Sequence, residues 1–339
     1  MSPYVKDYKR IANCTGLCLC IFIVMFYVTN TAVSVFSVLP IFMGEDLSYS
    51  IISVAQMIAY LSSFIIPAII LRSMLKRFGL LQPLRLDISL PLGSLLLIPA
   101  AIALALASSY VNSWLLLPFD ISDAYYELLG MSSESYAAYE ILIMFVSTAV
   151  VPAVCEEFLF RGAVLSSLMP FGRGVALVGS SVLFGLMHQN PYQMLYTTVA
   201  GLLIGYAYIK TRSIWCPMII HFCNNAFSVT EQVIGANCRA EVSAVLLPVM
   251  DTLMLLGGFI CLAIYLLKEA RLRRERLSQG SFGVIIEESD SYAAKPISPA
   301  DKLRCFFAPG MIVFVVLALI SVISTLLLLV LFSGMLAVA

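Results

Sequence analysis

The chain has 339 residues, of which 61% are hydrophobic and only 12% are charged. Soluble globular proteins carry about 25% charged residues, so this composition excludes a soluble domain and predicts an all-α, polytopic membrane helix bundle. The formal net charge is zero and no basic stripe with interleaved aromatic residues occurs, so nucleic acid is not an expected partner. The nine cysteines are scattered without a CxxC pair, which is typical of small packing residues.

Nine stretches of the chain are predicted to form membrane helices, since a span needs about 20 mostly apolar residues. In chain order they are 14–43, 51–71, 91–117, 137–168, 175–190, 193–210, 214–233, 244–267 and 309–335. The fifth and sixth stretches are short, and Asn190-Pro191 separates them, because a proline ends one helix and begins the next. We therefore expect a bundle of eight or nine transmembrane helices.

The placement of lysine and arginine predicts the orientation of this bundle. Basic residues precede the first stretch, which is too long for a cleaved signal peptide, so an uncleaved first span is expected. With the N-terminus inside, the outer loops contain Arg239 as their only basic residue, and the outer loops at 44–50 and 118–136 are acidic. We expect an integral protein of a bacterial plasma membrane, with a cytoplasmic N-terminus and an outer C-terminus.

Five segments are expected along the chain: three N-terminal spans in 1–136, a core in 137–233, an additional span at 244–267, a basic segment with a flexible linker in 268–308, and a C-terminal span at 309–335. The linker is predicted because the composition shifts to Ser, Gly, Glu, Asp and Pro. The last span is almost free of polar residues and is expected to face lipid. Gly201 and Gly205 form a GxxxG pair, which favours a close helix contact.

Two adjacent acids and an arginine interrupt the fourth stretch, which is otherwise apolar. An ionisable group in hydrocarbon costs about 2.5–3.5 kcal/mol on insertion scales, so such groups need partners and a function. Glu157 and Arg161 are four residues apart and are expected to pair on one helix face. Glu156 is turned about 100° away from Glu157, so it is expected to face a cavity.

The two histidines of the chain, His188 and His221, also lie in apolar stretches. Phe184 and His188 share one helix face, and His221 and Asn225 share another. At 1.5 Å per residue from the inner helix ends, Glu156, His188 and His221 lie about 16, 20 and 12 Å deep, respectively. Polar groups at similar depth on three helices predict a water-filled pocket, and we expect it to open toward the cytoplasmic side.

This set of side chains is compatible with several functions. A buried glutamate and a histidine can activate water, while a second histidine and an asparagine amide can stabilise an oxyanion, which together would hydrolyse a peptide. Glu156, His188 and His221 could instead bind a divalent metal such as zinc, which would also predict a hydrolase. A membrane scaffold that binds a partner without cutting it, and a transporter with a proton relay, are the remaining alternatives. No pair of interrupted helices in matching halves supports a transporter.

The order and spacing of these residues resemble a known family. The motifs Glu156-Glu157-x-x-x-Arg161, Phe184-x-x-x-His188 and His221-x-x-x-Asn225, on successive helices, are similar to the three motifs of the type II CAAX prenyl endopeptidase and bacteriocin-immunity family, called CPBP or ABI. The resemblance covers about residues 137–230. It implies a helical membrane peptidase whose catalytic core is 137–233.

The resemblance also implies a role for each residue. Glu156 and His188 would activate water, and His221 and Asn225 would form the oxyanion site. Glu157 and Arg161 would hold the pocket together, with Phe184 as a further supporting residue of the second motif.

For cofactors and partners, the resemblance leaves two possibilities open. A metal-free glutamate mechanism is expected, and the alternative is a zinc enzyme with Glu156, His188 and His221 as ligands. The expected substrate is a membrane-embedded or lipidated peptide or protein, prenylated or CAAX-like proteins included. A non-catalytic immunity protein of the same fold is the other activity that the family implies.

Overall fold

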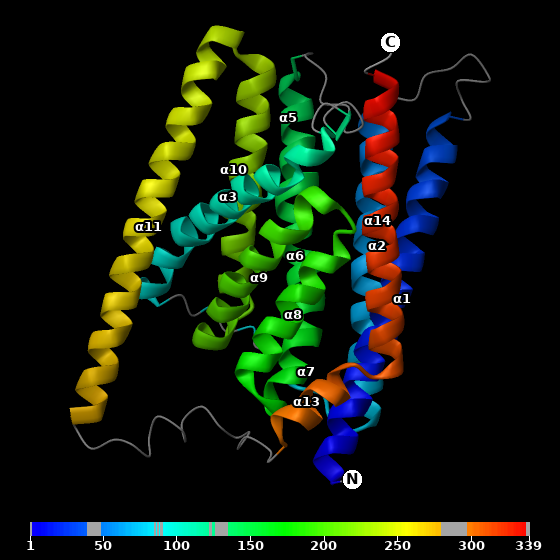
Figure 1. The fold of residues 1–339 in the computed structure, drawn as a ribbon, viewed down its shortest axis with the longest axis vertical. Coiled ribbons are helices and arrows are strands. Elements are labelled where there is room, and N and C mark those ends of the chain that lie inside the picture. Colours follow the sequence, from blue (N-terminus) through cyan, green and yellow to red (C-terminus); the bar gives the residue numbers. More distant parts are fainter. Residues whose placement is uncertain are drawn as a thin grey trace.

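The computed structural model describes residues 2–38, 49–84, 86, 88, 91–121, 124–125, 135–278 and 297–336, and this part of the chain contains helices and no strands. Each of the nine apolar stretches coincides with a helix or with a continuous helical path. The predicted all-α helix bundle is therefore confirmed, and Figure 1 shows the helices packed side by side along one long axis.

Three long helices stand together at one side of the bundle, and a fourth stands at the opposite side (Figure 1). The first three are α1 (Pro3–Val38), α2 (Tyr49–Arg77) and α14 (Pro309–Leu336), and the fourth is α11 (Ala240–Ser278). The helix α3 (Leu97–Leu116), which continues the short turn η2 (Leu92–Leu96) and ends in η3 (Leu117–Phe119), crosses obliquely between these two sides.

The central helices carry the residues that the sequence singled out. One continuous path consists of α5 (Ala138–Phe145), the π-helical segment η4 (Val146–Val150), α6 (Val151–Leu159), the π-helical segment η5 (Phe160–Leu165), α7 (Ser166–Leu168) and η6 (Met169–Phe171). It is followed by α8 (Arg173–Met187), α9 (Pro191–Thr211) and α10 (Trp215–Asn237).

Among the described residues, six helices are long and apolar enough to cross a membrane. They are 3–38, 51–77, 92–119, 138–171, 240–275 and 309–335. The three remaining central helices are α8, which is shorter, and α9 and α10, which carry more polar residues. The helix α8, which His188 follows, is apolar but short, whereas α10, which holds His221, is long and more polar, as expected for a helix that lines a polar interior.

The helices α8 and α9 form a hairpin that ends inside the bundle. The 15 residues of α8 span about 22 Å, less than the hydrocarbon core of about 30 Å. At the turn, the carbonyl of Gln189 accepts a hydrogen bond from Thr325 Oγ1 at 3.3 Å. Thr325 lies 11 residues before the end of α14, so the turn stops about 16 Å short of that end. The fifth stretch is therefore too short for the full crossing that was predicted, whereas the 21 residues of α9 span about 31 Å.

Polar groups make this buried turn stable. Gln189 adopts a left-handed conformation with φ of 53°, and the Asn190 side chain caps α9 by accepting from the backbone N–H of Tyr192 at 2.9 Å. The amide of Asn112 on α3 donates to the carbonyls of Pro191 and Tyr192, at 3.0 and 2.9 Å. These bonds satisfy backbone groups that lipid could not.

Glycines allow α8 and α9 to pack closely, as the GxxxG pair predicts. A Cβ atom on Gly201 would lie 3.2 Å from the Phe184 ring, and one on Gly205 would lie 2.7 Å from the Leu177 side chain. The closest approach is at Gly185, where a Cβ atom would lie 1.9 Å from Thr198 Oγ1 and 2.6 Å from the backbone oxygen of Met194.

We expect Gly185→Ala to destabilise the folded protein by about 1–3 kcal/mol, because the added methyl group must push α8 away from the α9 backbone. Gly174→Ala is the matched control on the same helix, since nothing lies within 4 Å of a Cβ atom there. Thermal unfolding in detergent measures both variants. Equal midpoints for the two variants would contradict this account of the hairpin.

The C-terminal helix does more than face lipid. Met311, Phe314 and Ala318 of α14 are fully buried, and a Cβ atom on Gly16 of α1 would lie 2.2 Å from the backbone of Gly310. The expectation that this span only faces lipid is therefore wrong for the face that packs against α1.

The segment predicted as 268–308 contains the end of one helix and a second, short helix. Residues 268–278 continue α11 as far as Ser278. Residues 299–306 form α13 (Pro299–Phe306), whose Cys305 contacts the backbone of Val5 in α1. The linker predicted between them falls on 279–296, which lies outside the described residues.

Candidate active site

The motif helix α6 lies between two π-helical segments, and this local irregularity connects it to α10. Pro152 at the start of α6 has no N–H, so it cannot donate to the carbonyl of Thr148 four residues earlier. The side-chain amide of Asn225 donates to that carbonyl at 3.0 Å. Isolated π-helical turns occur frequently at functional sites. Here the free carbonyl in η4 holds Asn225 of the third motif next to the helical path that carries the first motif.

Glu157 is the hub of a buried ionic network. Its Oε1 atom accepts from Arg161 Nη1 at 3.0 Å and from His221 Nδ1 at 2.7 Å. The side chains of Glu157 and Arg161 are 0% and 2% exposed, so the predicted pair is confirmed. Arg161 also donates from Nη2 to the carbonyl of Gly201 at 3.2 Å, which ties the network to α9. The carboxylate therefore fixes His221 in the tautomer that carries a proton on Nδ1.

Phe184 covers this network with its ring. The guanidinium carbon of Arg161 lies 4.7 Å from the centre of the Phe184 ring, a cation–π contact. The same ring meets His188 edge to face at 5.1 Å and His221 at 5.9 Å. The supporting position predicted for Phe184 thus lies between the arginine and both imidazoles.

Glu156 faces away from this network, as its position on the helix predicts. Its Oε1 atom accepts a hydrogen bond from the hydroxyl of Tyr60 on α2. Its Oε2 atom is buried, has no hydrogen-bond partner in the protein, and lies 4.0 Å from Nε2 of His221. A polar separation of that size is the distance at which one water molecule can bridge two groups.

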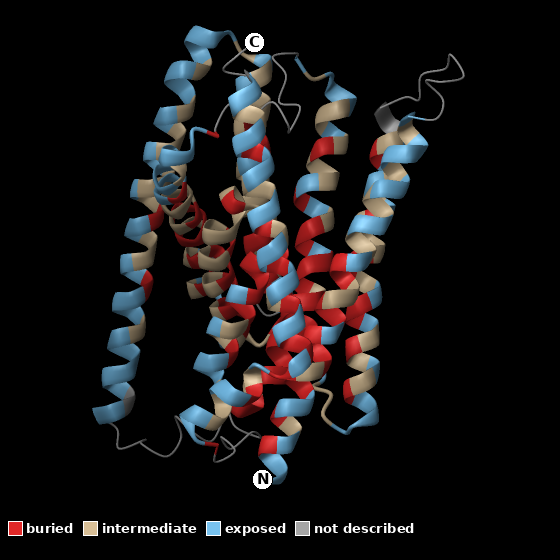
Figure 2. Ribbon diagram, turned by 45° about the vertical axis from the view of Figure 1, so that its right-hand side comes forward, coloured by how far each residue is buried: buried red, intermediate tan, exposed pale blue. Residues whose placement is uncertain are grey.

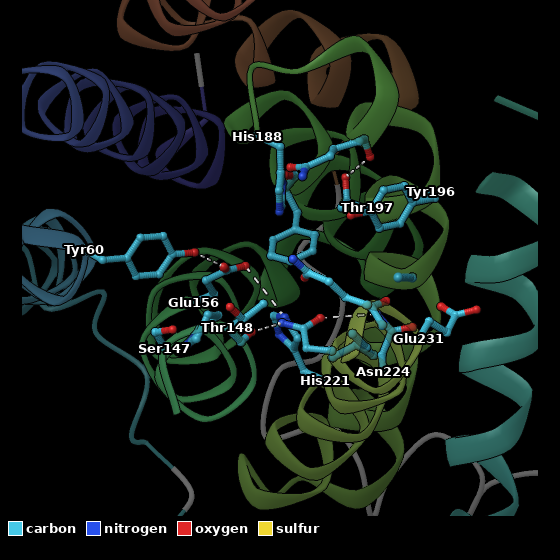
Figure 3. A pocket seen from close by; sticks show the side chains of 18 of the residues that line it. Tyr60, Ser147, Thr148, Glu156, His188, Tyr196, Thr197, His221, Asn224 and Glu231 are labelled. Atoms are coloured by element: carbon cyan, nitrogen blue, oxygen red, sulfur yellow. Dashed lines mark hydrogen bonds and ion pairs between the residues drawn. The ribbon is translucent and has the colours of Figure 1, made fainter. Parts of the chain in front are cut away.

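A cavity of about 960 Å³ brings the predicted residues together. Its lining includes Glu156, His188, His221, Asn224 and Asn225, and Figure 3 shows the labelled side chains directed toward a common space. The walls come from α2, η4, α6, α8, α9 and α10, with Leu247 of α11 at one side.

The orientations of His188 and the two asparagines are fixed by hydrogen bonds. Nδ1 of His188 lies 2.8 Å from the carbonyl of Phe184, which can only accept, so in the neutral ring Nε2 is the unprotonated nitrogen. The amide of Asn224 donates to Oδ1 of Asn225 at 3.3 Å. Both asparagines line the cavity. The four-residue spacing from His221 points to Asn225, but it does not exclude Asn224 from the site.

The direction of the cavity differs from the expected one. Along α10 the described lining runs from His221 to Ala236, the residue before the last of the helix, and it includes Tyr136 just before α5. This is the end of the bundle opposite the N-terminus (Figure 1). The expectation of an opening toward the N-terminal side is wrong, because the turn between α8 and α9 stops about 16 Å before the end of α14 and leaves the space beyond it to the cavity.

Tyr60 is a lining residue that contacts Glu156 and that the motifs do not include. It lies 96 positions before Glu156, on a helix without a recognisable motif. The available signal was a hydroxyl group in the middle of an apolar span, where a tyrosine needs a hydrogen-bond partner. Tyr196 and Thr197 of α9 also line the cavity (Figure 3).

The described residues contain no group of three or more His, Cys, Asp and Glu side chains arranged to hold an ion. Of the three ligands considered from the sequence, Glu156 keeps Oε2 and His221 keeps Nε2 without a hydrogen bond to protein, while Nδ1 of His221 is held by Glu157. A carboxylate behind a histidine is compatible with metal binding as well as with a metal-free site, so the zinc alternative stays open.

Comparison with known proteins adds a family to this geometry. Residues 138–227 match the sequence model of the family described as Type II CAAX prenyl endopeptidase Rce1-like. Over 119 residues the chain is 29% identical to the Bacillus subtilis (strain 168) protein named "Putative membrane peptidase YdiL". That alignment covers 32% of this chain and 48% of the relative, so the chain spans about half the length of the curated relative it matches. No solved structure matches the chain.

Proposed function

We propose that this chain, which belongs to the CPBP family of membrane proteases through its residues 138–227, is an intramembrane endopeptidase. It hydrolyses a peptide bond of a membrane-associated peptide or protein inside the cavity. The observation that carries the proposal is the buried Glu156 carboxylate, which keeps one oxygen without a hydrogen-bond partner in the protein, in a cavity that two histidines share. Prenylated and CAAX-like proteins are one possible class of such substrates.

The reaction that these groups favour begins with a water molecule held by Oε2 of Glu156. As the water oxygen attacks the carbonyl carbon of the peptide, its proton passes to Glu156, and Nε2 of His188 accepts the remaining hydrogen bond. The new C–O bond leaves a negative charge on the former carbonyl oxygen. When the C–N bond breaks, the proton on Glu156 moves to the leaving nitrogen, so one water molecule is consumed and a carboxyl group and an amine are formed.

His221 and the asparagine pair are suited to stabilise that oxyanion. A protonated His221 would donate from Nε2 into the cavity, with Glu157 as the counter-ion on the other side of the ring. The amide of Asn225 uses one N–H for Thr148 and has a second available, and Asn224 orients the same amide. Because these partners fix the donors in advance, little reorganisation is needed during the reaction.

Cleavage of a library of membrane peptides by the purified protein in proteoliposomes tests the proposal. We expect cleavage by the wild type and strongly reduced cleavage by His188→Ala. A scaffold or immunity protein that binds without cutting would give no cleavage with the wild type. That result would favour the non-catalytic alternative.

We expect cleavage to be unchanged by metal chelators, since Glu156 activates water without an ion in this mechanism. The assay compares rates before and after dialysis against a strong chelator, together with the metal content of the purified protein. A chelator-sensitive rate that zinc restores would support the zinc alternative with Glu156, His188 and His221 as ligands.

We expect Tyr60→Phe to lower kcat by about 10–100-fold. The variant removes one hydrogen bond to a charged group, which contributes about 1.5–3 kcal/mol, and it leaves Glu156 free to rotate. Tyr27→Phe on the exposed side of α1 is the matched control and is expected to retain the wild-type rate. Steady-state kinetics with a cleaved peptide measures both variants, and equal rates would remove Tyr60 from the mechanism.

A further inference from the structure

Basic side chains gather at one end of the bundle. Contacts between elements show that these ends lie together: Lys210 pairs with Glu269, and Arg10 stacks 4.6 Å from the centre of the Phe78 ring. Nζ of Lys268 and of Lys302 lie 3.2 and 3.0 Å from Cβ positions built on Gly93 and Gly172, respectively. Of the described lysines and arginines, only Arg239 lies at the opposite end, and Arg161 lies in the buried network.

The candidate active site is closed toward this basic end. Beyond Glu157 and Arg161, the path continues into side chains that are at most 1% exposed, namely Phe160, Val164, Leu165 and Leu168. On α10, Cys216 and Ile220 are buried in the same direction. Figure 2 shows that the buried residues concentrate in the half of the bundle nearer the N-terminus.

The cavity extends in the other direction. From His221 its described lining follows α10 for 15 residues to Ala236, a length of about 22 Å. No lysine or arginine is among the described residues that line it, and its wall contains four tyrosines: Tyr60, Tyr125, Tyr136 and Tyr196. Its volume of about 960 Å³ lies at the upper end for ligand pockets, which suits a short stretch of peptide.

From this arrangement we infer that the substrate bond reaches Glu156 from the face of the membrane opposite the basic end. Lysine and arginine collect on the cytoplasmic side of membrane proteins, so the cavity serves the extracytoplasmic side. The substrate class is then a membrane-anchored peptide or protein whose cleaved segment lies outside the cytoplasm. The choice of substrate rests on the proposed peptidase function, whereas the access route does not.

Cysteine accessibility tests the access route. Gly235→Cys and Ser228→Cys introduce thiols at two depths of the cavity lining, and nothing lies within 4 Å of a Cβ atom on Gly235. Ser278→Cys at the basic end of α11 is the matched control. The parent protein has its four half-buried cysteines replaced by alanine, namely Cys20, Cys223, Cys238 and Cys261. A membrane-impermeant sulfonated maleimide is applied to bacterial spheroplasts and to inverted membrane vesicles.

We expect the Gly235→Cys and Ser228→Cys variants to react at least about tenfold faster in spheroplasts than in inverted vesicles, and Ser278→Cys to show the reverse. Reaction of the cavity variants only in inverted vesicles, in both preparations equally, or in neither would overturn the inference. A control variant that reacts from outside would overturn it as well. The second cavity variant guards against misfolding of the first.

The same experiment in a Glu156→Gln background separates the two proposals, since labelling requires no catalysis. If the labelling follows the expectation while Glu156→Gln still cleaves peptides, the peptidase mechanism fails and the access route remains. If that variant is inactive but the cavity reacts from the basic side, the access route fails and the peptidase mechanism remains. Where both proposals hold, the impermeant reagent blocks cleavage of an anchored peptide by spheroplasts that carry Gly235→Cys.

Discussion

Replacement of Glu156 by glutamine is expected to lower the rate of peptide cleavage by about 10²–10⁴-fold, the range that general acid–base catalysis contributes. The amide keeps the shape of the side chain and can still accept a hydrogen bond from Tyr60. It cannot take a proton from water, so the chemical step should fail while substrate binding remains. The expected signature is a loss in kcat with little change in KM.

Glu140→Gln provides the matched control for this experiment. It is the same chemical change on the same helical path, at a residue whose carboxylate caps the start of α5 by accepting from the backbone N–H of Ala137 at 2.8 Å. We expect its cleavage rate to stay within about twofold of the wild type, because the residue does not line the cavity and the glutamine oxygen can accept the same hydrogen bond. A Glu156→Gln variant as active as Glu140→Gln would leave the buried acid without a catalytic role.

Replacement of Arg161 by methionine is expected to destabilise the folded protein by about 3–5 kcal/mol, as when one partner of a buried ion pair is removed. The variant leaves Glu157 without its guanidinium partner and removes the hydrogen bond to the Gly201 carbonyl. Because Glu157 also orients His221, we expect cleavage by the remaining folded protein to fall as well.

The Lys210→Met variant is the control for charge removal. Lys210 and Glu269 also form an ion pair, but their side chains are 42% and 36% exposed. Exposed pairs contribute about 0–1 kcal/mol, so we expect a change of that size. Thermal unfolding in detergent measures both variants, and similar losses for the two would contradict the structural role of the buried network.

Local spacing predicted the parts of the site that lie on single helices. The four-residue separation of Glu157 and Arg161 and the rotation of Glu156 to another face follow from helix geometry alone, and the structure confirms both. The convergence of Glu156, His188, His221 and Asn225 on one cavity was also expected. Their roles in a reaction remain predictions that the variants described here test.

Contacts between distant parts of the chain could not be predicted in this way. The bond from Tyr60 to Glu156 joins residues on different helices, and no periodicity within either helix indicates it. Pro152 indicates that the Thr148 carbonyl lacks its usual helix partner, but nothing in the sequence pairs that carbonyl with Asn225 on another helix. The depth of the α8–α9 turn follows from its hydrogen bonds to Thr325 and Asn112, which lie on distant helices. The direction in which the cavity extends could therefore not be predicted from the sequence.

The π-helical segments at both ends of α6 also limit how this part of the chain can vary in length. A π-helical turn holds one residue more than an α-helical turn, so deleting a residue from η4 would let an unbroken α-helix form there. Because the wide turn absorbs that extra residue, Glu156 would keep its angular phase after the deletion, whereas a deletion on the α-helical stretch between Val151 and Glu156 would turn it by about 100°. Single-residue length changes are therefore tolerated in the π-helical segments and not in α6.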